Sequence, residues 1–206
     1  MENTRAKTTR NSLILLLTAT IWGMAFVSQS KGMDYMHPFT FNGVRSLIGA
    51  AGILVYILIS RKIAGDKVAK LDWKLNVKAG LLCGIFLTIA STLQQFGIKY
   101  TSVGKAGFIT TLYIIFVPMF GIFLKKKVAP VVWAAAGMAA VGMYLLCMTE
   151  SLRLGAGDIM VFLCAIAFAI QIMTVDHYAA RIDGAVVSCI QFTVCGVVCC
   201  IGALIW

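Results

Sequence analysis

Long apolar stretches separated by short polar segments run through the whole chain of 206 residues. A transmembrane α-helix needs about 20 consecutive, mostly apolar residues to cross the hydrocarbon core of a bilayer. Because these stretches have that length, they predict an all-α polytopic membrane protein with about seven transmembrane helices. The predicted spans are roughly 12–30, 38–59, 78–98, 103–124, 128–148, 157–175 and 184–206.

A basic segment precedes the first apolar stretch and contains Arg5, Lys7 and Arg10. A positively charged start followed by an apolar run also fits a cleaved signal peptide. The first run is long, however, and six further spans follow it. We therefore expect a retained first helix, preceded by a cytoplasmic amino-terminal segment over residues 1–11.

The composition agrees with a membrane protein. Hydrophobic residues make up 60% of the chain and charged residues 13%, against roughly 45–50% and 25% in soluble domains. The seven cysteines form no CxxC pair and have no histidine at zinc-ligand spacing. We interpret them as small apolar residues within helices, and we expect neither a metal nor a cofactor.

The net charge of +10 would suit a nucleic-acid-binding protein, but the charges lie in short runs between apolar segments. Thirteen lysines and arginines fall in the amino terminus and in the connections 60–78, 125–127 and 176–183, whereas four fall in the alternate connections. The positive-inside rule then places the amino terminus in the cytoplasm. The expected partner is the lipid bilayer of the cell membrane, with no nucleic acid.

A shift of 146 residues aligns the first two spans with the last two without gaps, pairing Trp22 with Phe168 and Arg45 with Gln191. The match is mainly one of hydropathy, and any two apolar hairpins can align in this way. The number of helices is more informative. The second copy begins after five spans, an odd number, so it enters the membrane from the opposite side. This is the condition for the inverted repeats of many transporters.

The expected domain organisation follows from that repeat. Residues 12–148 form a first five-helix repeat, and residues 149–206 form the start of a second repeat with two helices. A complete second repeat needs three further spans. We therefore expect a helical bundle of inverted five-helix repeats that is truncated after about seven transmembrane helices.

Four short motifs resemble the EamA family of the drug/metabolite transporter superfamily. The sequence WGMAF at 22–26 is similar to the WG-x-x-F opening of that family, and FNGVR at 41–45 is similar to its F-x-x-x-R signature. The segment 97–106 leading to Pro118 resembles the junction of its third and fourth helices, and 137–146 resembles its fifth helix. Each motif is short, and their order and spacing carry the resemblance.

The resemblance implies ten helices in two five-helix halves and transport of small metabolites, amino acids or drugs. The implied partner is therefore a small-molecule substrate. The chain departs from the family pattern in two ways. It lacks most of the second half, and it carries three lysines at 125–127 where members often have a glutamate after the fourth helix.

Arg45 is the clear ionisable residue deep inside a predicted span. Such a residue costs at least ~2.5 kcal/mol to insert and is a functional candidate by default. Asn42 lies one turn earlier on the same helix face. We expect both side chains to face a central cavity, where the guanidinium holds a substrate carboxylate or phosphate with two parallel hydrogen bonds. The alternative is that Arg45 extends outward or bonds backbone carbonyls of a neighbouring helix.

Other polar and aromatic side chains within the spans are weaker substrate-binding candidates, and the alternative for each polar one is a hydrogen bond between helices worth about 0.6 kcal/mol. Pro118 removes a backbone hydrogen bond and is the predicted hinge. The remaining candidates for substrate binding are Trp22, Gln94, Gln95, Thr110, Tyr113, Gln171 and Gln191.

Several chemistries find no support in the sequence. All eight carboxylates lie in termini, loops or predicted helix ends, so no carboxylate relay for protons is visible. The chain has no HExxH, GxSxG, P-loop or GxGxxG motif, and we expect no enzyme activity. The predicted function is transport of small molecules by alternating access, with export as the expected direction. The alternative is a non-transporting assembly or scaffold subunit of the membrane.

Overall fold

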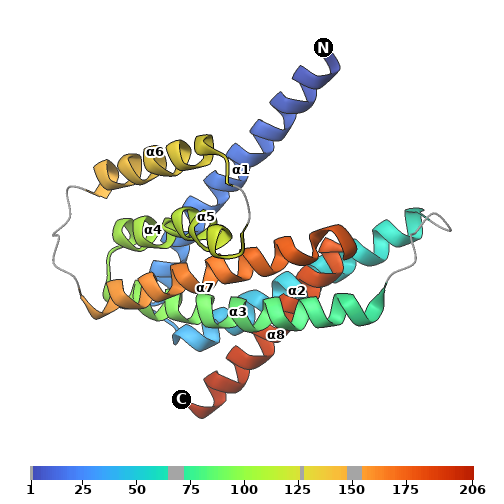
Figure 1. The fold of residues 1–206 in the computed structure, drawn as a ribbon. Helices are drawn as coiled ribbons and strands as arrows, with labels where there is room; N and C mark the ends of the chain where they lie inside the picture. Colours follow the sequence, from blue (N-terminus) through green and yellow to red (C-terminus); the bar gives the residue numbers. More distant parts are fainter. Residues whose placement is uncertain (1, 65–71, 126–127, 148–154) are drawn as a thin grey trace.

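The computed structural model describes residues 2–64, 72–125, 128–147 and 155–206. Every regular element in these ranges is helical, and the helices form a bundle from which α1 extends (Figure 1). The elements are α1 (Glu2–Gly32), α2 (Pro38–Ala64), α3 (Trp73–Tyr100), α4 (Val103–Thr111), α5 (Tyr113–Phe123), α6 (Pro130–Cys147), α7 (Ala156–Tyr178), the 3₁₀ turn η2 (Ala179–Arg181) and α8 (Gly184–Ile205).

Six helical segments of the described residues are long and apolar enough to cross a membrane. This confirms the prediction of an all-α polytopic membrane protein. The remaining predicted span, 128–148, corresponds to α6, whose apolar stretch Pro130–Gly142 is shorter than these six segments. The six segments are Thr8–Gly32, Pro38–Ile63, Trp73–Tyr100, Val103–Phe123, Ala156–Arg181 and Gly184–Ile205.

The predicted span 103–124 contains a break, because α4 ends at Thr111 and α5 begins at Tyr113. At the junction, the Leu112 amide donates to the carbonyl of Ile109 at 3.2 Å, which is the tighter 3₁₀ spacing. Pro118 lies inside α5, beyond this junction. The irregular position is therefore not at the proline itself, and the hinge role of Pro118 stays a prediction.

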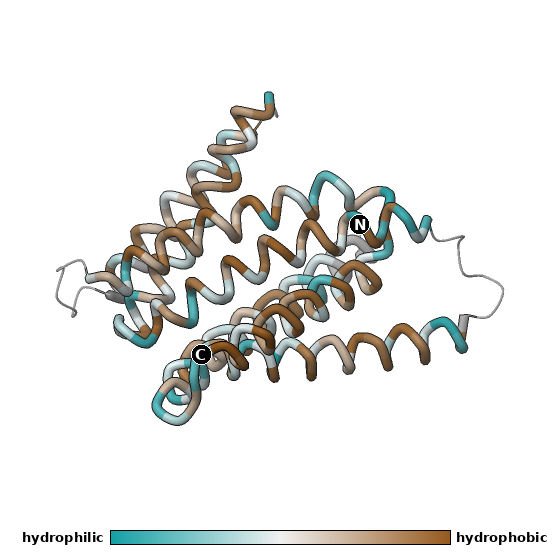
Figure 2. Tube along the Cα trace, turned by 90° about the horizontal axis from the view of Figure 1, so that it is seen from below, coloured by the Kyte–Doolittle hydropathy of each residue, from teal (hydrophilic) through white to brown (hydrophobic). Residues whose placement is uncertain are grey.

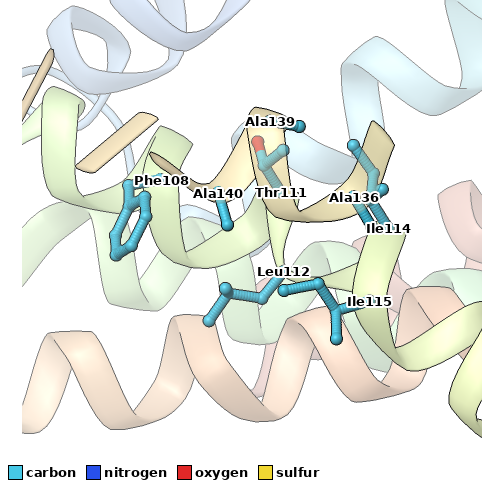
Figure 3. Close-up of a pocket in the computed structure, with 8 residues that line it drawn as sticks. All are labelled: Phe108, Thr111, Leu112, Ile114, Ile115, Ala136, Ala139 and Ala140. Atoms are coloured by element: carbon cyan, nitrogen blue, oxygen red, sulfur yellow. The ribbon is translucent and has the colours of Figure 1, made fainter. Parts of the chain in front are cut away.

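Helix α6 packs against this broken span through its alanines (Figure 3). Ala136, Ala139 and Ala140 face the α4–α5 junction, and the gap left between them has a volume of about 10 Å³. That is about one water-sized space, and its lining is almost entirely apolar. We interpret it as a packing gap.

Helix α3 lies at the centre of the described bundle and packs against both α7 and α8 through small residues. A methyl group added at Gly157 would lie 2.8 Å from the carbonyl oxygen of Gly97, so the two backbones approach closely. On the other side, a methyl group at Gly80 would meet Ile190 at 2.7 Å. Small residues allow such approach, and close packing replaces the hydrophobic driving force that is absent between helices in lipid.

Polar contacts bring the end of α2 and the starts of α3 and α8 to the same end of the bundle, as the hairpin pattern predicts. The Asp183 carboxylate, just before α8, lies 4.0 Å from the guanidinium of Arg61 at the end of α2 as an ion pair, and the Asp183 amide donates to Asn76 at the start of α3 at 2.8 Å. We call this end of the bundle, at the right of Figure 1, the basic end. It carries Arg61, Lys62, Lys74, Lys78, Lys125 and Arg181.

Apolar side chains cover much of the outer surface. Figure 2 shows hydrophobic positions along most of the length of the helices, with hydrophilic positions gathered toward their ends. The most apolar 18-residue stretch of α1 within Thr8–Gly32 has no buried residue, and its Leu15 and Met24 side chains are well exposed. Water would not favour this surface, whereas the hydrocarbon of a bilayer does.

Candidate functional site

A cavity of about 380 Å³ lies between five helices, α1, α2, α3, α7 and α8. Its size falls within the roughly 300–1,000 Å³ of small-molecule sites in proteins. Most of its wall is apolar, and a few polar groups face it, which is the usual composition of such sites. We call it the central cavity. It is lined by Trp22, Ala25, Phe26, Gln29, Arg45, Ser46, Gly49, Leu87, Ser91, Gln94, Phe168, Phe192 and Cys195.

Arg45 lines the central cavity. It lies seven residues after Pro38, or roughly 10 Å along α2 at 1.5 Å per residue. Its guanidinium carbon lies 5.6 Å from the centre of the Phe41 ring, within reach of a cation–π contact. Among the described residues no carboxylate forms an ion pair with Arg45. Its positive charge therefore has no protein counter-ion in this part of the chain.

Asn42 does not line the central cavity, although it shares a helix with Arg45. Its side chain is fully buried between α2 and α3, and its amide nitrogen donates to the carbonyl of Ser91 at 2.9 Å. Positions three apart on a helix differ in direction by about 60°. That difference turns Asn42 into the helix interface and leaves Arg45 facing the cavity.

The two glutamines of α3 also differ in whether they face the central cavity. Gln94 lines the central cavity, and its amide nitrogen donates to the buried hydroxyl of Thr110 on α4 at 3.2 Å. Gln95 is fully buried and donates to the backbone carbonyl of Gln29 at 3.3 Å. The structure therefore places Gln94 on the wall of the cavity, Thr110 behind it, and Gln95 against α1.

The remaining sequence candidates are distributed over four places. Trp22 lines the central cavity, whereas half-buried Tyr113 at the start of α5 does not. Gln171 donates to Gln191 at 3.0 Å, and this pair joins α7 to α8 outside the cavity lining. Pro118 lines a separate cavity of about 360 Å³ between α5, α6 and α7.

Gln29 is the main residue that the sequence interpretation missed. It lines the central cavity and is 5% exposed, and its buried amide oxygen receives no hydrogen bond from the described residues. An unsatisfied buried acceptor of this kind calls for a donor from water or a ligand. Helical spacing was a signal for it, because Gln29 follows Trp22 by seven residues and Phe26 by three.

Positions related by the shift of 146 residues meet at the central cavity. Three such pairs line it: Trp22 with Phe168, Ser46 with Phe192, and Gly49 with Cys195. The hydroxyl of Ser46 also lies 3.5 Å from the sulfur of Cys195. Arg45 and Gln191 differ, because only Arg45 is on the wall.

No group of three or more His, Cys, Asp or Glu side chains in the described residues could hold a metal ion. The described cysteines are free, and Cys195 makes contacts with Ser46 and Ser91 at 3.5 and 3.4 Å. The polar groups at the central cavity are thus a guanidinium, amides, hydroxyls and a thiol. This set can bind the polar part of a small molecule by hydrogen bonds and charge.

Comparison with known proteins gives a family. Residues 10–148 match the EamA-like transporter family. A curated relative, an "Uncharacterized transporter" of Archaeoglobus fulgidus, is 30% identical over 171 residues, which cover 80% of this chain and 48% of the relative. The chain thus spans about half the length of this relative. No solved structure matches the chain. Because the family match covers most of the chain, the protein belongs to the EamA-like transporter family.

Proposed function

We propose that this protein is a carrier that moves small molecules with an anionic group across the cell membrane, with the central cavity as its cargo site. The observation that carries the proposal is Arg45, a cation without a protein counter-ion in the described part of the chain, on the wall of a cavity of about 380 Å³. A guanidinium within a membrane span is costly and is a functional candidate by default.

The lining suggests how a cargo is held. The fork of the Arg45 guanidinium offers paired donors that match a carboxylate or phosphate. Trp22 and Phe168 supply aromatic surface for an apolar body, and the amide of Gln94 adds a hydrogen-bonding group. The amide oxygen of Gln29 accepts a further donor from the cargo or from water that accompanies it.

Alternating access is the mechanism that we propose for movement of the cargo. The support is that several pairs of positions related by the 146-residue shift line the same cavity. In inverted-repeat carriers, two related halves rock around a site between them and expose it to each side in turn. The proposed orientation has the amino terminus in the cytoplasm, the basic end on the cytoplasmic side, and net movement outward.

The test is transport by the full-length gene product in proteoliposomes loaded with radiolabelled carboxylates, phosphates and their uncharged analogues. We expect efflux of an anionic compound and no efflux of its uncharged analogue. Arg45→Gln and Arg45→Lys should each reduce efflux by about tenfold or more, since lysine lacks the paired donors. The matched control is Lys99→Gln, which removes an exposed cation outside the cavity.

The two alternatives give different results. Normal efflux by both Arg45 variants would refute the anion-binding role while leaving a carrier. Absence of efflux for every compound, together with stable copurification of another membrane protein, would favour the scaffold subunit over the carrier.

A further inference from the structure

A second large cavity lies between α3, α5 and α7 near the basic end of the bundle, and we call it the lateral crevice. Its volume is about 480 Å³, and it shares no lining residue with the central cavity. Each of its three helices contributes to the wall. The crevice is lined by Leu82, Phe120, Phe123, Leu124, Ile170, Met173, Thr174, His177 and Tyr178.

The lateral crevice is apolar and open to the surface of the bundle. Phe123 and Leu124 on its edge are 78% and 64% exposed. Thr174 brings a hydroxyl, but this hydroxyl donates to the carbonyl of Ile170 at 2.8 Å within its own helix. A surface of this kind at membrane depth accepts a hydrocarbon chain more readily than a polar molecule.

Two lysines flank the crevice where it approaches the basic end. Lys78 lies one helical turn before Leu82 on α3, so the two residues are neighbours on one face. Lys125 directly follows Leu124, and its left-handed backbone (φ 57°) ends α5 there. Both lysines are exposed, and neither has an ion-pair partner among the described side chains.

Two further ionisable side chains lie near this end of the crevice. His177 is part of the lining and offers ring nitrogens at the same end. The nearest acidic residue in sequence is Asp176, which lines the separate cavity of Pro118 and Met173. The mouth of the lateral crevice therefore combines an apolar wall with positive charge.

We propose that the lateral crevice binds an anionic phospholipid, with one acyl chain against Leu82, Ile170 and Met173 and the phosphate near Lys78 and Lys125. Basic pockets between transmembrane helices on the cytoplasmic side attract anionic head groups, and each nearby lysine adds to the attraction. The acyl chain accounts for the apolar wall, and the head group accounts for the lysines. This proposal does not depend on what the central cavity carries.

The test measures phospholipid retained by the full-length protein after delipidation and incubation with mixed micelles of detergent and either palmitoyl-oleoyl phosphatidylglycerol or phosphatidylcholine. Native mass spectrometry counts the bound lipid. We expect phosphatidylglycerol to be retained over phosphatidylcholine by about tenfold or more, and Lys78→Gln/Lys125→Gln to abolish that preference. Lys31→Gln/Lys99→Gln, with the same loss of charge at the opposite end, should preserve it.

A second pair of variants tests the apolar wall. Leu82→Trp fills the crevice and should reduce retention of phosphatidylglycerol, whereas Leu81→Trp, at an exposed position outside the lining, should not. Lys78→Arg/Lys125→Arg keeps the charge and should retain the lipid, which separates lost binding from misfolding.

Four results would overturn the proposal. The first is equal retention of the two lipids. The second is no difference between Lys78→Gln/Lys125→Gln and the control at the opposite end. The third is equal retention by Leu82→Trp and Leu81→Trp, which would indicate a head-group contact without a bound chain. Displacement by inorganic phosphate at low concentration would likewise point to a free-anion site and contradict a lipid site.

Discussion

Lys105 and Asp158 form an ion pair that joins α4 to α7 at the end of the bundle opposite the basic end. The lysine nitrogen and a carboxylate oxygen lie 3.0 Å apart, and the two side chains are only 17% and 3% exposed. The carboxylate also accepts from the hydroxyl of Thr101 and from the amide of Gly155. One carboxylate therefore gathers the end of α3 and the starts of α4 and α7.

Removing one partner of this pair should strongly destabilise the protein. Asp158→Leu removes the carboxylate of a largely buried ion pair, and removal of one partner of such a pair costs about 3–5 kcal/mol in measured cases. The double variant Lys105→Met/Asp158→Leu should be closer to wild type, because apolar replacements of a whole buried pair are often neutral. Thermal unfolding in detergent measures both. Equal destabilisation of the single and double variants would contradict this role of the pair.

The close approach of α3 and α7 should not tolerate a side chain. Gly157→Ala places a methyl group 2.8 Å from the Gly97 carbonyl oxygen, and the required shift should cost about 1–3 kcal/mol. Gly107→Ala is the matched control, because an added methyl group there meets no atom within 4 Å. It should be neutral or stabilising, since glycine costs roughly 0.5–1 kcal/mol relative to alanine within a helix. Comparison of the two melting temperatures decides the prediction.

The orientation in the membrane can be checked with cysteines at exposed positions on opposite ends of the bundle. Tyr35, between α1 and α2, should lie outside the cell, and Lys62, near the end of α2, should lie inside. In intact cells, a membrane-impermeant maleimide should therefore label Tyr35→Cys and not Lys62→Cys. The wild-type chain corrects for native cysteines. The reverse labelling pattern would invert the proposed topology.

The aromatic walls of the central cavity should contribute to cargo binding from both sides. For a cargo identified in the efflux assay, Trp22→Ala and Phe168→Ala should each weaken binding by about five- to thirtyfold, the equivalent of roughly 1–2 kcal/mol of lost apolar contact. Trp133→Ala in α6 is the control, because Trp133 is not part of the lining. Isothermal titration with the purified protein gives the dissociation constants. An effect from only one of the two walls would count against cargo held between the repeats.

Asn42 and Arg45 lie one turn apart, but we expect Asn42 to contribute to stability and Arg45 to contribute to cargo affinity. Asn42→Ala removes a buried hydrogen bond to the Ser91 carbonyl and should lower stability, at about 0.6 kcal/mol or more for a hydrogen bond between membrane helices. Cargo affinity should hardly change, because Asn42 is not on the cavity wall. Arg45→Gln should show the opposite pattern. Loss of affinity in Asn42→Ala at unchanged stability would place Asn42 in the site.

The helices were predictable because a bilayer leaves the backbone few choices. An apolar run of about 20 residues must satisfy its own hydrogen bonds, so hydropathy and length alone indicate a helix. The expected starts at 38, 157 and 184 agree with the observed starts at Pro38, Ala156 and Gly184 to within about one residue. Other bounds differ: α1 and α3 begin at Glu2 and Trp73, before the predicted starts at 12 and 78, and the predicted span 103–124 becomes two helices at Leu112.

The side-chain roles could be predicted only in part. Arg45 was identifiable because its charge is costly in lipid. The contacts of the uncharged polar residues could not be predicted from the sequence, as Asn42, Gln29 and Gln95 show. In a helix that is apolar on all sides, hydropathy does not say which face meets a neighbour and which meets a cavity.

The sequence by itself determined the class, the helices and the alternation of their direction, because these follow from apolar length and from the short connections between spans. Only the tertiary structure decided the rotation of each helix and its neighbours. It placed Trp22 and Phe168 on one cavity and turned Asn42 away from it. The physical reason is that close packing and hydrogen bonds between helices, not hydrophobicity, distinguish one helix face from another in a membrane.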